Sequence, residues 1–468
     1  IAGAGSVSGG SLDASNLLKP VLSSGKIRCI GSTTFDEYKK IFEKDHALAR
    51  RFQKIDINEP SKEETLLILK GLQERYESYH GVRYQPEALR VAVDLSSQYL
   101  TDRRLPDKAI DIMDEAGAWC RLHQKNNEMV VDVSLIEKTV AKVAKIPEQS
   151  VSTNEKERLR NLPEIVHSQI FGQDQAIDQV VKAIKRSRSG FKTKEKPTGC
   201  FLFAGPTGVG KTQLARTLAQ SLGVSLLRFD MSEYQEKHTV SRLIGSPPGY
   251  VGFEEGGLLT DAVRREPYGI VLLDEIEKAH SDIYNILLQV MDYGFLTDNQ
   301  GRKADFRNAI IIMTSNAGAR DVNKPLIGFG DRTQDSAAII EAVEKTFSPE
   351  FRNRLDAIVP FSHLSLDIMK SVVEKEIAKL GSILSEKKVK LKVSPEAVLW
   401  LAKKGYSQEF GARNVERTIE SYISSELVEE VLFGKLEKGG TVSISISISK
   451  EGEKEKLHFT YRVSKKDV

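Results

Sequence analysis

The stretch Gly205-Pro-Thr-Gly-Val-Gly-Lys-Thr212 decides the fold of this chain. It follows a short apolar run over residues 200–204, which predicts a buried strand, and it precedes a segment with leucines at helical spacing. A strand, a glycine-rich turn and a helix in this order are the context of a phosphate-binding loop. A chance glycine-rich turn is the alternative interpretation, and the agreement between motif and context argues against it.

The loop over residues 205–212 has the chemistry that a nucleoside triphosphate requires. Its glycines let backbone N–H groups curl around phosphate oxygens, because no Cβ is in the way. The N-terminus of the following helix adds positive potential. Lys211 supplies a charge for the β- and γ-phosphates, and the Thr212 hydroxyl is a ligand for Mg²⁺. The predicted nucleotide-binding residues of the loop are Gly205, Pro206, Thr207, Gly208, Val209, Gly210, Lys211 and Thr212.

Composition and charge are those of an ordinary soluble globular protein, with 40% hydrophobic and 28% charged residues. The net charge of +3, from 68 basic and 65 acidic residues, argues against a dedicated nucleic-acid-binding surface. The cysteines Cys29, Cys120 and Cys200 lie far apart and fit no metal-binding spacing, which is typical of reduced thiols in a cytosolic protein. We find no apolar run long enough to span a bilayer and no signal peptide, so we predict a cytoplasmic protein without a membrane partner.

A pair of carboxylates, Asp274 and Glu275, follows the apolar run over residues 270–273. This run predicts a buried strand, and ligands of open α/β sheets bind at the carboxyl ends of such strands. We expect Asp274 to hold Mg²⁺ and Glu275 to polarise a water molecule for in-line attack on the γ-phosphate. Alone the pair would be a polar turn, but together with the upstream loop it predicts an ATPase.

Three further residues are candidates for the same chemistry. Asn316 follows a strand predicted over residues 309–314 and is expected to orient the attacking water, although an Asn that caps a turn is the alternative. Arg354 and Arg413 carry guanidinium groups, which suit the charge of a phosphoryl group in the transition state. Isolated arginines are usually solvated or ion-paired, so spacing alone does not assign either of them.

The segment Gly249-Tyr-Val-Gly252 places an aromatic residue between glycines and directly after two prolines. Such a loop is either a buried turn or an exposed aromatic surface that grips extended chains. Tyr250, Val251 and Gly252 are therefore candidates for contact with a substrate.

The second half of the chain predicts a large domain followed by a small one. Residues 166–360 alternate strands with helices, which predicts a parallel sheet covered on both faces. Residues 361–468 are mostly helical, with a strictly alternating and therefore half-buried strand over residues 442–448. The strands expected in the large domain lie over residues 201–204, 226–229, 270–273 and 309–314.

The first half predicts the same order of a mixed domain and a helical domain, without the front of the mixed one. We expect residues 1–60 to be the end of the mixed domain, with a strand over residues 27–30. Residues 61–145 predict a small helical domain, and residues 146–165 a linker. Because the chain starts at Ile1 within a Gly/Ser-rich stretch, we also expect it to be a piece of a longer protein.

The motifs together resemble those of the Clp/Hsp100 branch of the AAA+ ATPases, and the resemblance covers essentially the whole chain. It implies an α/β fold, in which an AAA+ module has a parallel sheet, flanking helices and a smaller, mostly helical lid domain. The tail of a first AAA+ module would precede it. The matching segments are residues 205–212, 230–234, 238–245, 247–252, 272–280 and 301–308.

The resemblance also implies roles for the nucleotide site. Lys211 and Thr212 would belong to the Walker A motif, and Asp274 and Glu275 to the Walker B motif. Asn316 would be the residue called sensor 1. ATP and Mg²⁺ would be bound there.

Other implied roles concern the surroundings of that site. Ile170 and Phe171, in the segment over residues 170–173, would line the adenine pocket. Arg413 would be sensor 2, and Arg354 the arginine finger that completes the site of a neighbouring subunit. The family assembles as a homohexamer, which the finger requires.

Two implied features concern substrates and the first module. Tyr250, with Val251 and Gly252, would form the pore loop that pushes a substrate polypeptide through the ring. In the first half, Thr33 would be a sensor 1, and Arg50 and Arg51 a finger pair, but no Walker motif precedes them.

Two departures favour the ClpA type within the family. The chain after Ala118 is too short for the coiled-coil insertion of the ClpB and ClpC types. Residues Ile327, Gly328 and Phe329 resemble the tripeptide with which Clp unfoldases dock on the ClpP peptidase. Exposed apolar side chains commonly mark an interaction site, although a loop tucked into the local core is the alternative.

The predicted function is an ATP-dependent protein unfoldase that threads substrates, delivered with adaptor proteins, into a ClpP-type peptidase. The chain shows no peptidase motif of its own. A stand-alone disaggregase, a nucleic-acid-acting AAA+ motor and a non-hydrolysing scaffold are the alternatives. The balanced charge and the aromatic loop argue against the nucleic-acid motor.

Overall fold

The computed structural model describes most of the chain. The predicted pore loop at residues 250–252 and the predicted docking tripeptide at residues 327–329 lie outside the described residues. The described residues are 6–7, 10–11, 20, 22, 24, 27–39, 49–50, 52–100, 103–123, 129–144, 155–191, 193, 195–245, 256–318, 332–406, 411–437, 439–448 and 455–463.

The centre of the second half is a five-stranded parallel sheet with the strand order β11-β5-β10-β7-β6. All four strands predicted for this domain are confirmed. The fifth, β11, was not predicted, because its four residues end in a proline that only an edge strand tolerates. The strands are β5 (Gly199–Ala204), β6 (Leu226–Asp230), β7 (Ile270–Asp274), β10 (Ile310–Ser315) and β11 (Ala357–Pro360).

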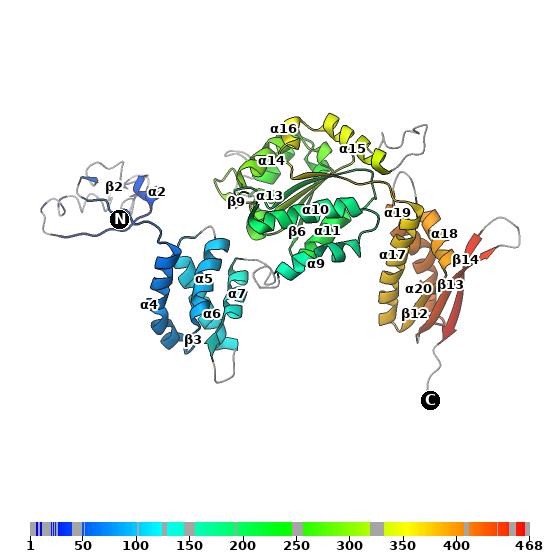
Figure 1. Cartoon of the computed structure of the whole chain (residues 1–468), viewed down its shortest axis with the longest axis horizontal. Helices are drawn as coiled ribbons and strands as arrows, with labels where there is room; N and C mark the ends of the chain where they lie inside the picture. Colours follow the sequence, from blue (N-terminus) through cyan, green and yellow to red (C-terminus); the bar gives the residue numbers. More distant parts are fainter. Residues whose placement is uncertain are drawn as a thin grey trace.

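Helices cover both faces of this sheet, as its continuous apolar strands require (Figure 1). Phe203, Leu272 and Ile312 share one core cluster with the helices of the first face. Val271 and Met313 share the other cluster with the helices of the second face. The first face has α9 (Glu155–His167), α10 (Asp174–Arg186) and α11 (Lys211–Leu222); the second has α12 (Lys237–Ile244), α13 (Leu258–Arg265), α14 (Ser281–Tyr293), α15 (Arg332–Thr346) and α16 (Pro349–Arg352).

Helix α9 extends the ATPase domain toward the N-terminus. It begins at Glu155, inside the stretch over residues 146–165 that the sequence suggested as a linker. Leu162 and Val166 are buried in the core beneath the sheet, so the second part of this stretch packs with the domain that follows it.

The C-terminal small domain joins helices to a three-stranded sheet with the order β12-β13-β14. The predicted strand over residues 442–448 is confirmed, and Val442 and Ile444 point into the core. The neighbouring strands were missed because lysines, a histidine and an arginine interrupt their apolar residues. The elements are α17 (Leu366–Glu386), β12 (Val389–Val393), α18 (Pro395–Gly405), α19 (Arg413–Ile419), α20 (Ser425–Leu432), β13 (Gly440–Ile448) and β14 (Glu455–Val463).

The first small domain packs four helices around a core that contains Leu69, Leu89, Ile112 and Ile136. Its first helix starts after Ser61, whose side chain accepts a hydrogen bond from the Glu64 N–H in a capping box. The elements are α4 (Lys62–His80), β3 (Arg83–Tyr84), α5 (Pro86–Tyr99), α6 (Asp107–His123), β4 (Val130–Val131) and α7 (Val133–Val143).

The strand predicted over residues 27–30 is wrong. These residues have no regular secondary structure, and the side chains of Ile27 and Ile30 are exposed. Among the described residues no strand pairs with them, and an apolar run without a partner cannot satisfy its backbone as a strand. The described elements before residue 60 are β1 (Ser6–Val7), β2 (Gly10–Ser11) and α2 (Phe35–Glu37).

No helix in the described part of the chain is long and apolar enough to cross a membrane.

Candidate active site

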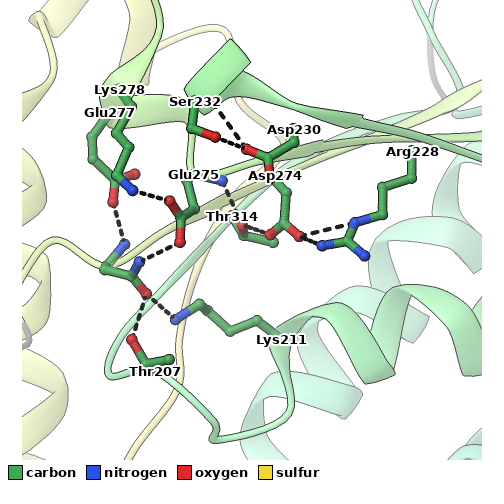
Figure 2. A network of polar contacts seen from close by, with 11 residues as sticks. Thr207, Lys211, Arg228, Asp230, Ser232, Asp274, Glu275, Glu277, Lys278 and Thr314 are labelled. Atoms are coloured by element: carbon green, nitrogen blue, oxygen red, sulfur yellow. Dashed lines mark hydrogen bonds and ion pairs between the residues drawn. The ribbon is translucent and has the colours of Figure 1, made fainter. Parts of the chain in front are cut away.

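Four of the predicted site residues, Thr207, Lys211, Asp274 and Glu275, lie together at the carboxyl edge of the sheet (Figure 2). Strand β5 leads into the glycine-rich loop, β7 ends at Asp274, and β10 ends one residue before Asn316. Because β10 pairs with both β5 and β7, Asn316 emerges between the loop and the carboxylates. The parallel sheet thus brings together three segments that are distant in sequence.

The glycine-rich loop needs glycine for two different reasons. A Cβ on Gly205 would lie 2.3 Å from the carbonyl oxygen of Phe361, so only glycine permits this close approach. Gly210 has a φ of +109° and nothing within 4 Å of its Cβ position, so there the backbone conformation and not space demands glycine. Helix α11 begins directly after Gly210 and has no side-chain cap, so its first N–H groups remain open to an anion.

Lys211 is a buried cation, with 7% of its surface exposed. Its Nζ donates to the carbonyl oxygens of Gly205, at 2.6 Å, and Pro206, at 2.7 Å, and to Asn316 Oδ1 at 3.0 Å. Burial lowers the pKa of Lys211 to about 8, although the nearby carboxylates, Glu277 foremost, act in the opposite direction. In the described part of the structure it forms no ion pair with a carboxylate, so the ammonium group suits an anionic ligand such as a phosphate.

Asp274 is held by partners on both of its oxygens. Arg228 of β6 donates to Oδ2 from Nε, at 3.1 Å, and from a terminal nitrogen, at 2.6 Å. The Thr314 hydroxyl donates to Oδ1, and its oxygen accepts a hydrogen bond from the Glu275 N–H at 3.0 Å. Thr314 therefore links the Asp274 carboxylate to the Glu275 main chain through one buried hydroxyl.

Glu275 leaves the line of strand β7 in a left-handed conformation, with a φ of +56°. This conformation is uncommon for a residue other than glycine, and such strain is often found at functional sites. The Glu275 carboxylate forms an ion pair with Lys278, and its Oε1 lies 3.5 Å from Asn316 Nδ2.

Asn316 has hydrogen-bond partners on both sides of the site. Its Oδ1 accepts hydrogen bonds from Lys211 and, at 3.3 Å, from the Thr207 hydroxyl. Its N–H donates to Glu277 Oε1 at 3.0 Å. One amide side chain therefore faces the loop on one side and Glu275 on the other, which is the placement expected of a group that orients a water molecule between them.

Sequence reasoning did not identify Arg228, Thr314 and Glu277 as members of the site. Arg228 is a charged residue within the otherwise apolar run over residues 226–229, and this was a usable signal. Thr314 and Glu277 carry no such signal, because they look like ordinary strand and turn residues. The second oxygen of Glu277 is buried and has no hydrogen-bond partner among the described residues.

The residues present fit the binding of Mg²⁺ with a nucleotide. Among the described residues no group of three His, Cys, Asp or Glu side chains is arranged to hold a metal ion alone. Mg²⁺ usually takes only one or two protein ligands and completes its shell with phosphates and water. Asp274, at the end of β7, and Thr212, in the first turn of α11, are ligands of that kind.

Comparison with known proteins gives three matching family models. They are the AAA domain (Cdc48 subfamily) over residues 196–358, the AAA lid domain over residues 61–166, and the C-terminal, D2-small domain of ClpB protein over residues 364–444. Together these models cover most of the ATPase sheet, the first small domain, and the C-terminal small domain up to residue 444.

Similar proteins extend the match to nearly the whole chain. The ClpA homolog protein of Fuscovulum blasticum is 54% identical, over 95% of this chain and 56% of the relative. Chaperone protein ClpB of Oceanobacillus iheyensis is 41% identical, over 94% of this chain and 62% of the relative. A closed-state cryo-EM reconstruction of Hsp104 with ATPγS and FITC casein has a TM-score of 0.78 at 38% identity, over 97% of this chain and 77% of that one. The chain belongs to the Clp/Hsp100 family of AAA+ ATPases.

The AAA+ fold and the Clp/Hsp100 resemblance predicted from the sequence are therefore confirmed. The chain spans 56% and 62% of the lengths of the ClpA and ClpB relatives named above. The ClpB relative and the Hsp104 structure match along with the ClpA homolog, so the comparisons identify the family rather than one of its types.

The C-terminal small domain of this Clp/Hsp100 chain touches the loop directly. The Ala412 N–H donates to the Gly208 carbonyl oxygen at 3.0 Å, and a Cβ on Gly411 would lie 2.8 Å from the same oxygen. Arg413, predicted as sensor 2, is the first residue of α19 and is exposed directly after this contact. The start of α19 therefore lies beside the loop.

Arg354, the predicted arginine finger, is not joined to the loop of its own chain by any hydrogen bond or ion pair within the described residues. Its guanidinium pairs with Asp292 at 2.6 Å and Glu350 at 3.2 Å. Hydrogen bonding to Asp292 raises its pKa, so it stays charged. Its side chain remains 27% exposed, which is consistent with a role toward another molecule.

Ile170 and Phe171, predicted to line the adenine pocket, precede helix α10. Ile170 is buried in the same core cluster as Val209 of the loop, and Phe171 is half-buried. Gln173, two residues after Phe171, donates to the Val209 carbonyl oxygen at 3.3 Å, which places this segment beside the glycine-rich loop.

Proposed function

We propose that this chain is the motor part of an ATP-dependent protein unfoldase, driven by ATP hydrolysis at residues 205–212. The observation that carries the proposal is the network around Asn316, which joins Lys211, Thr207 and Glu275 at one sheet edge. A cation for the phosphates, a carboxylate for the water and an amide between them are the parts that phosphoryl transfer to water requires.

Each residue has a defined task in this proposal. Lys211 and the N–H groups of the loop bind the β- and γ-phosphates. Asp274 and Thr212 hold Mg²⁺, which neutralises charge on the phosphates when it is bound. Glu275 accepts the proton of the attacking water, and Asn316 fixes the position of that water.

Two arginines complete the site in the proposal. Arg413 approaches from the small domain of the same chain, because α19 starts beside the loop. Arg354 is supplied to the site of a neighbouring copy, in a homohexameric ring, where a guanidinium stabilises the charge that develops in the transition state. In this proposal, hydrolysis depends on the position of the C-terminal small domain and on assembly of the ring.

We further propose that the ring threads a substrate polypeptide, brought by adaptor proteins, into a ClpP-type peptidase. Tyr250 would grip the polypeptide, and residues 327–329 would dock on the peptidase. The support for this ClpA-type function is the sequence pattern at these positions, with the ClpA homolog among the relatives.

A stand-alone disaggregase is the second candidate function. It is favoured by the similarity to a ClpB relative and to a structure of Hsp104 with casein. Both candidates use the same site and the same Tyr250, and they differ only in the need for a peptidase.

The test uses a tagged, stably folded substrate with the purified chain, ATP and a ClpP-type peptidase. Tyr250→Ala should leave ATP turnover within about twofold and abolish unfolding, whereas Tyr250→Phe should retain both. Unfolding by Tyr250→Ala at the rate of the parent chain would reject the pore-loop role. Deletion of residues 327–329 should leave ATP turnover intact and abolish peptidase binding, and retained binding would favour the disaggregase.

A further inference from the structure

Gln173 is a buried amide between the nucleotide loop and the small C-terminal domain. It occupies the N-cap of α10, yet its side chain makes no hydrogen bond to the N–H groups of that helix. Only 4% of its surface is exposed. A buried amide that does not cap its own helix must find its partners elsewhere, and these partners define what it does.

The Gln173 side chain has three hydrogen bonds to two separate segments of main chain. Its Nε2 donates to the Ser362 carbonyl oxygen at 2.9 Å, and the Ser362 N–H donates back to Oε1 at 3.3 Å. The same Nε2 donates to the Val209 carbonyl oxygen at 3.3 Å. Both N–H bonds of the amide are thus used, one on each segment.

Ser362 belongs to the hinge between the two domains. Strand β11 ends at Pro360 and helix α17 begins at Leu366, so residues 361–365 are the connection between the ATPase sheet and the small domain. The hinge starts against the end of β5, directly before the nucleotide loop, because the Phe361 N–H donates to the Ala204 carbonyl oxygen at 2.8 Å.

The small domain also contacts the segment that carries Gln173. A Cβ on Gly172 would lie 2.3 Å from Ile368 Cδ1 of α17, so this contact is close. Lys375, also of α17, donates to the Gln169 carbonyl oxygen at 2.7 Å. Helix α17 therefore lies directly against the residues before α10.

The Val209 carbonyl belongs to the same peptide group as the Gly210 N–H, which lies in the phosphate-binding loop. A peptide group is planar and trans, so its C=O and the following N–H point in opposite directions. By holding the Val209 carbonyl, Gln173 directs the Gly210 N–H away from itself and limits the rotation of this peptide. A phosphate oxygen that accepts from the Gly210 N–H would act on the same peptide plane.

We propose that Gln173 is a positioning residue that couples phosphate binding in the loop to the angle of the C-terminal small domain. The proposal rests on the proposed function of the loop as a nucleotide site. Phosphate binding orients the Val209–Gly210 peptide, Gln173 transmits that orientation to the Ser362 main chain, and the hinge sets the position of α17.

The experiment measures nucleotide affinity and domain angle in the same protein. Dyes are placed by Lys182→Cys on α10 and Lys390→Cys on β12, both exposed, in a Cys29→Ser background, because Cys29 is the exposed cysteine of the described residues. Energy transfer between the dyes is followed during titration with ADP and with a slowly hydrolysed ATP analogue. Thermal melts confirm that each variant is folded.

Gln173→Met keeps the side-chain length and removes all three hydrogen bonds. We expect nucleotide affinity about tenfold weaker, since two buried carbonyl groups lose a partner. At saturating nucleotide we expect less than half of the parent change in energy transfer. Gln173→Glu, which keeps the acceptor for Ser362 N–H but has no donor, should behave in the same way.

Lys375→Met is the matched control, because it removes a contact between α17 and the same segment without touching the loop. It should retain the affinity and the full change in energy transfer. Three results would overturn the coupling. Both Gln173 variants could show the full change in energy transfer, or Lys375→Met could lose as much of that change as they do. The parent chain could also bind nucleotide without any change in energy transfer. A parent chain that binds no nucleotide would instead reject the proposed function itself.

Discussion

Thr314 is the most informative position in the site for a stability measurement. Its side chain is buried, with 1% of its surface exposed, and it joins Asp274 Oδ1 to the Glu275 N–H. Thr314→Val has nearly the same shape, so it removes the hydroxyl and its two hydrogen bonds while the volume of the side chain hardly changes.

The expected loss follows from these two bonds. A hydrogen bond to a charged group contributes about 1.5–3 kcal/mol, and a neutral one about 0.5–1.5 kcal/mol. Arg228 still holds the other oxygen of Asp274, so we expect a loss of about 2–4 kcal/mol in the free energy of unfolding of the ATPase domain. For a domain of this size that lowers its melting temperature by about 4–16 °C.

Differential scanning calorimetry of the whole chain measures the melting temperature. Domains that unfold separately give separate transitions, and the shift is read from the transition of the ATPase domain. Thr314→Ser, which keeps the hydroxyl, is the matched control and should lose less than half as much. ATP turnover should fall in Thr314→Val, since Asp274 and the Glu275 backbone lose their common anchor. Equal melting temperatures for Thr314→Val and the parent chain would refute this reasoning.

Three further predictions concern charges at the site. The pKa of Lys211 is lowered to about 8 in the free protein, and a bound phosphate favours the charged form of its amine. Nucleotide binding should therefore take up a proton above pH 8 and not at pH 7, and nucleotide affinity should fall as the pH rises through 8. Calorimetry in buffers of different ionisation enthalpy measures this proton uptake, and equal uptake at pH 7 and 8.5 would contradict the prediction. Arg228→Met removes the cation that is paired with the Asp274 carboxylate and that opposes a bound Mg²⁺, so the Mg²⁺ concentration for half-maximal ATP binding should fall about threefold. A rise in that concentration would show that Arg228 orients Asp274 instead. Glu277→Ala leaves the Asn316 N–H without its acceptor, so kcat should fall about tenfold with little change in KM. Glu277→Gln keeps an acceptor and should retain most of the turnover. Equal losses of turnover in the two variants would mean that the charge of Glu277 matters and the hydrogen bond does not.

The sequence was most informative where local pattern and tertiary fold agree. Residues 201–204 and 270–273 are continuous apolar runs, and a strand covered on both faces needs such runs. For this reason four of the five strands of the sheet were predicted, and the structure places the loop directly after β5 and Asp274 at the end of β7. The strand predicted over residues 27–30 failed because a strand exists only with a neighbour, and a local pattern does not show whether one is present.

The supporting residues of the site were hidden for a different reason. Thr314 matters because β10 lies beside β7, and Gln173 matters because the hinge at Ser362 folds back to the loop. Such pairs are separated by 40 and 189 positions in the chain. Their roles depend on which strands and segments become neighbours, so they become visible only in the folded structure.

In the proposed mechanism, Glu275 activates the water that attacks ATP bound at residues 205–212. The most direct measurement compares the parent chain with Glu275→Gln for ATP affinity and for turnover. Affinity should stay within about threefold, and turnover should fall at least about a hundredfold, while Glu341→Gln on the exposed side of α15 changes neither. Turnover in Glu275→Gln equal to that of the parent chain would contradict the account.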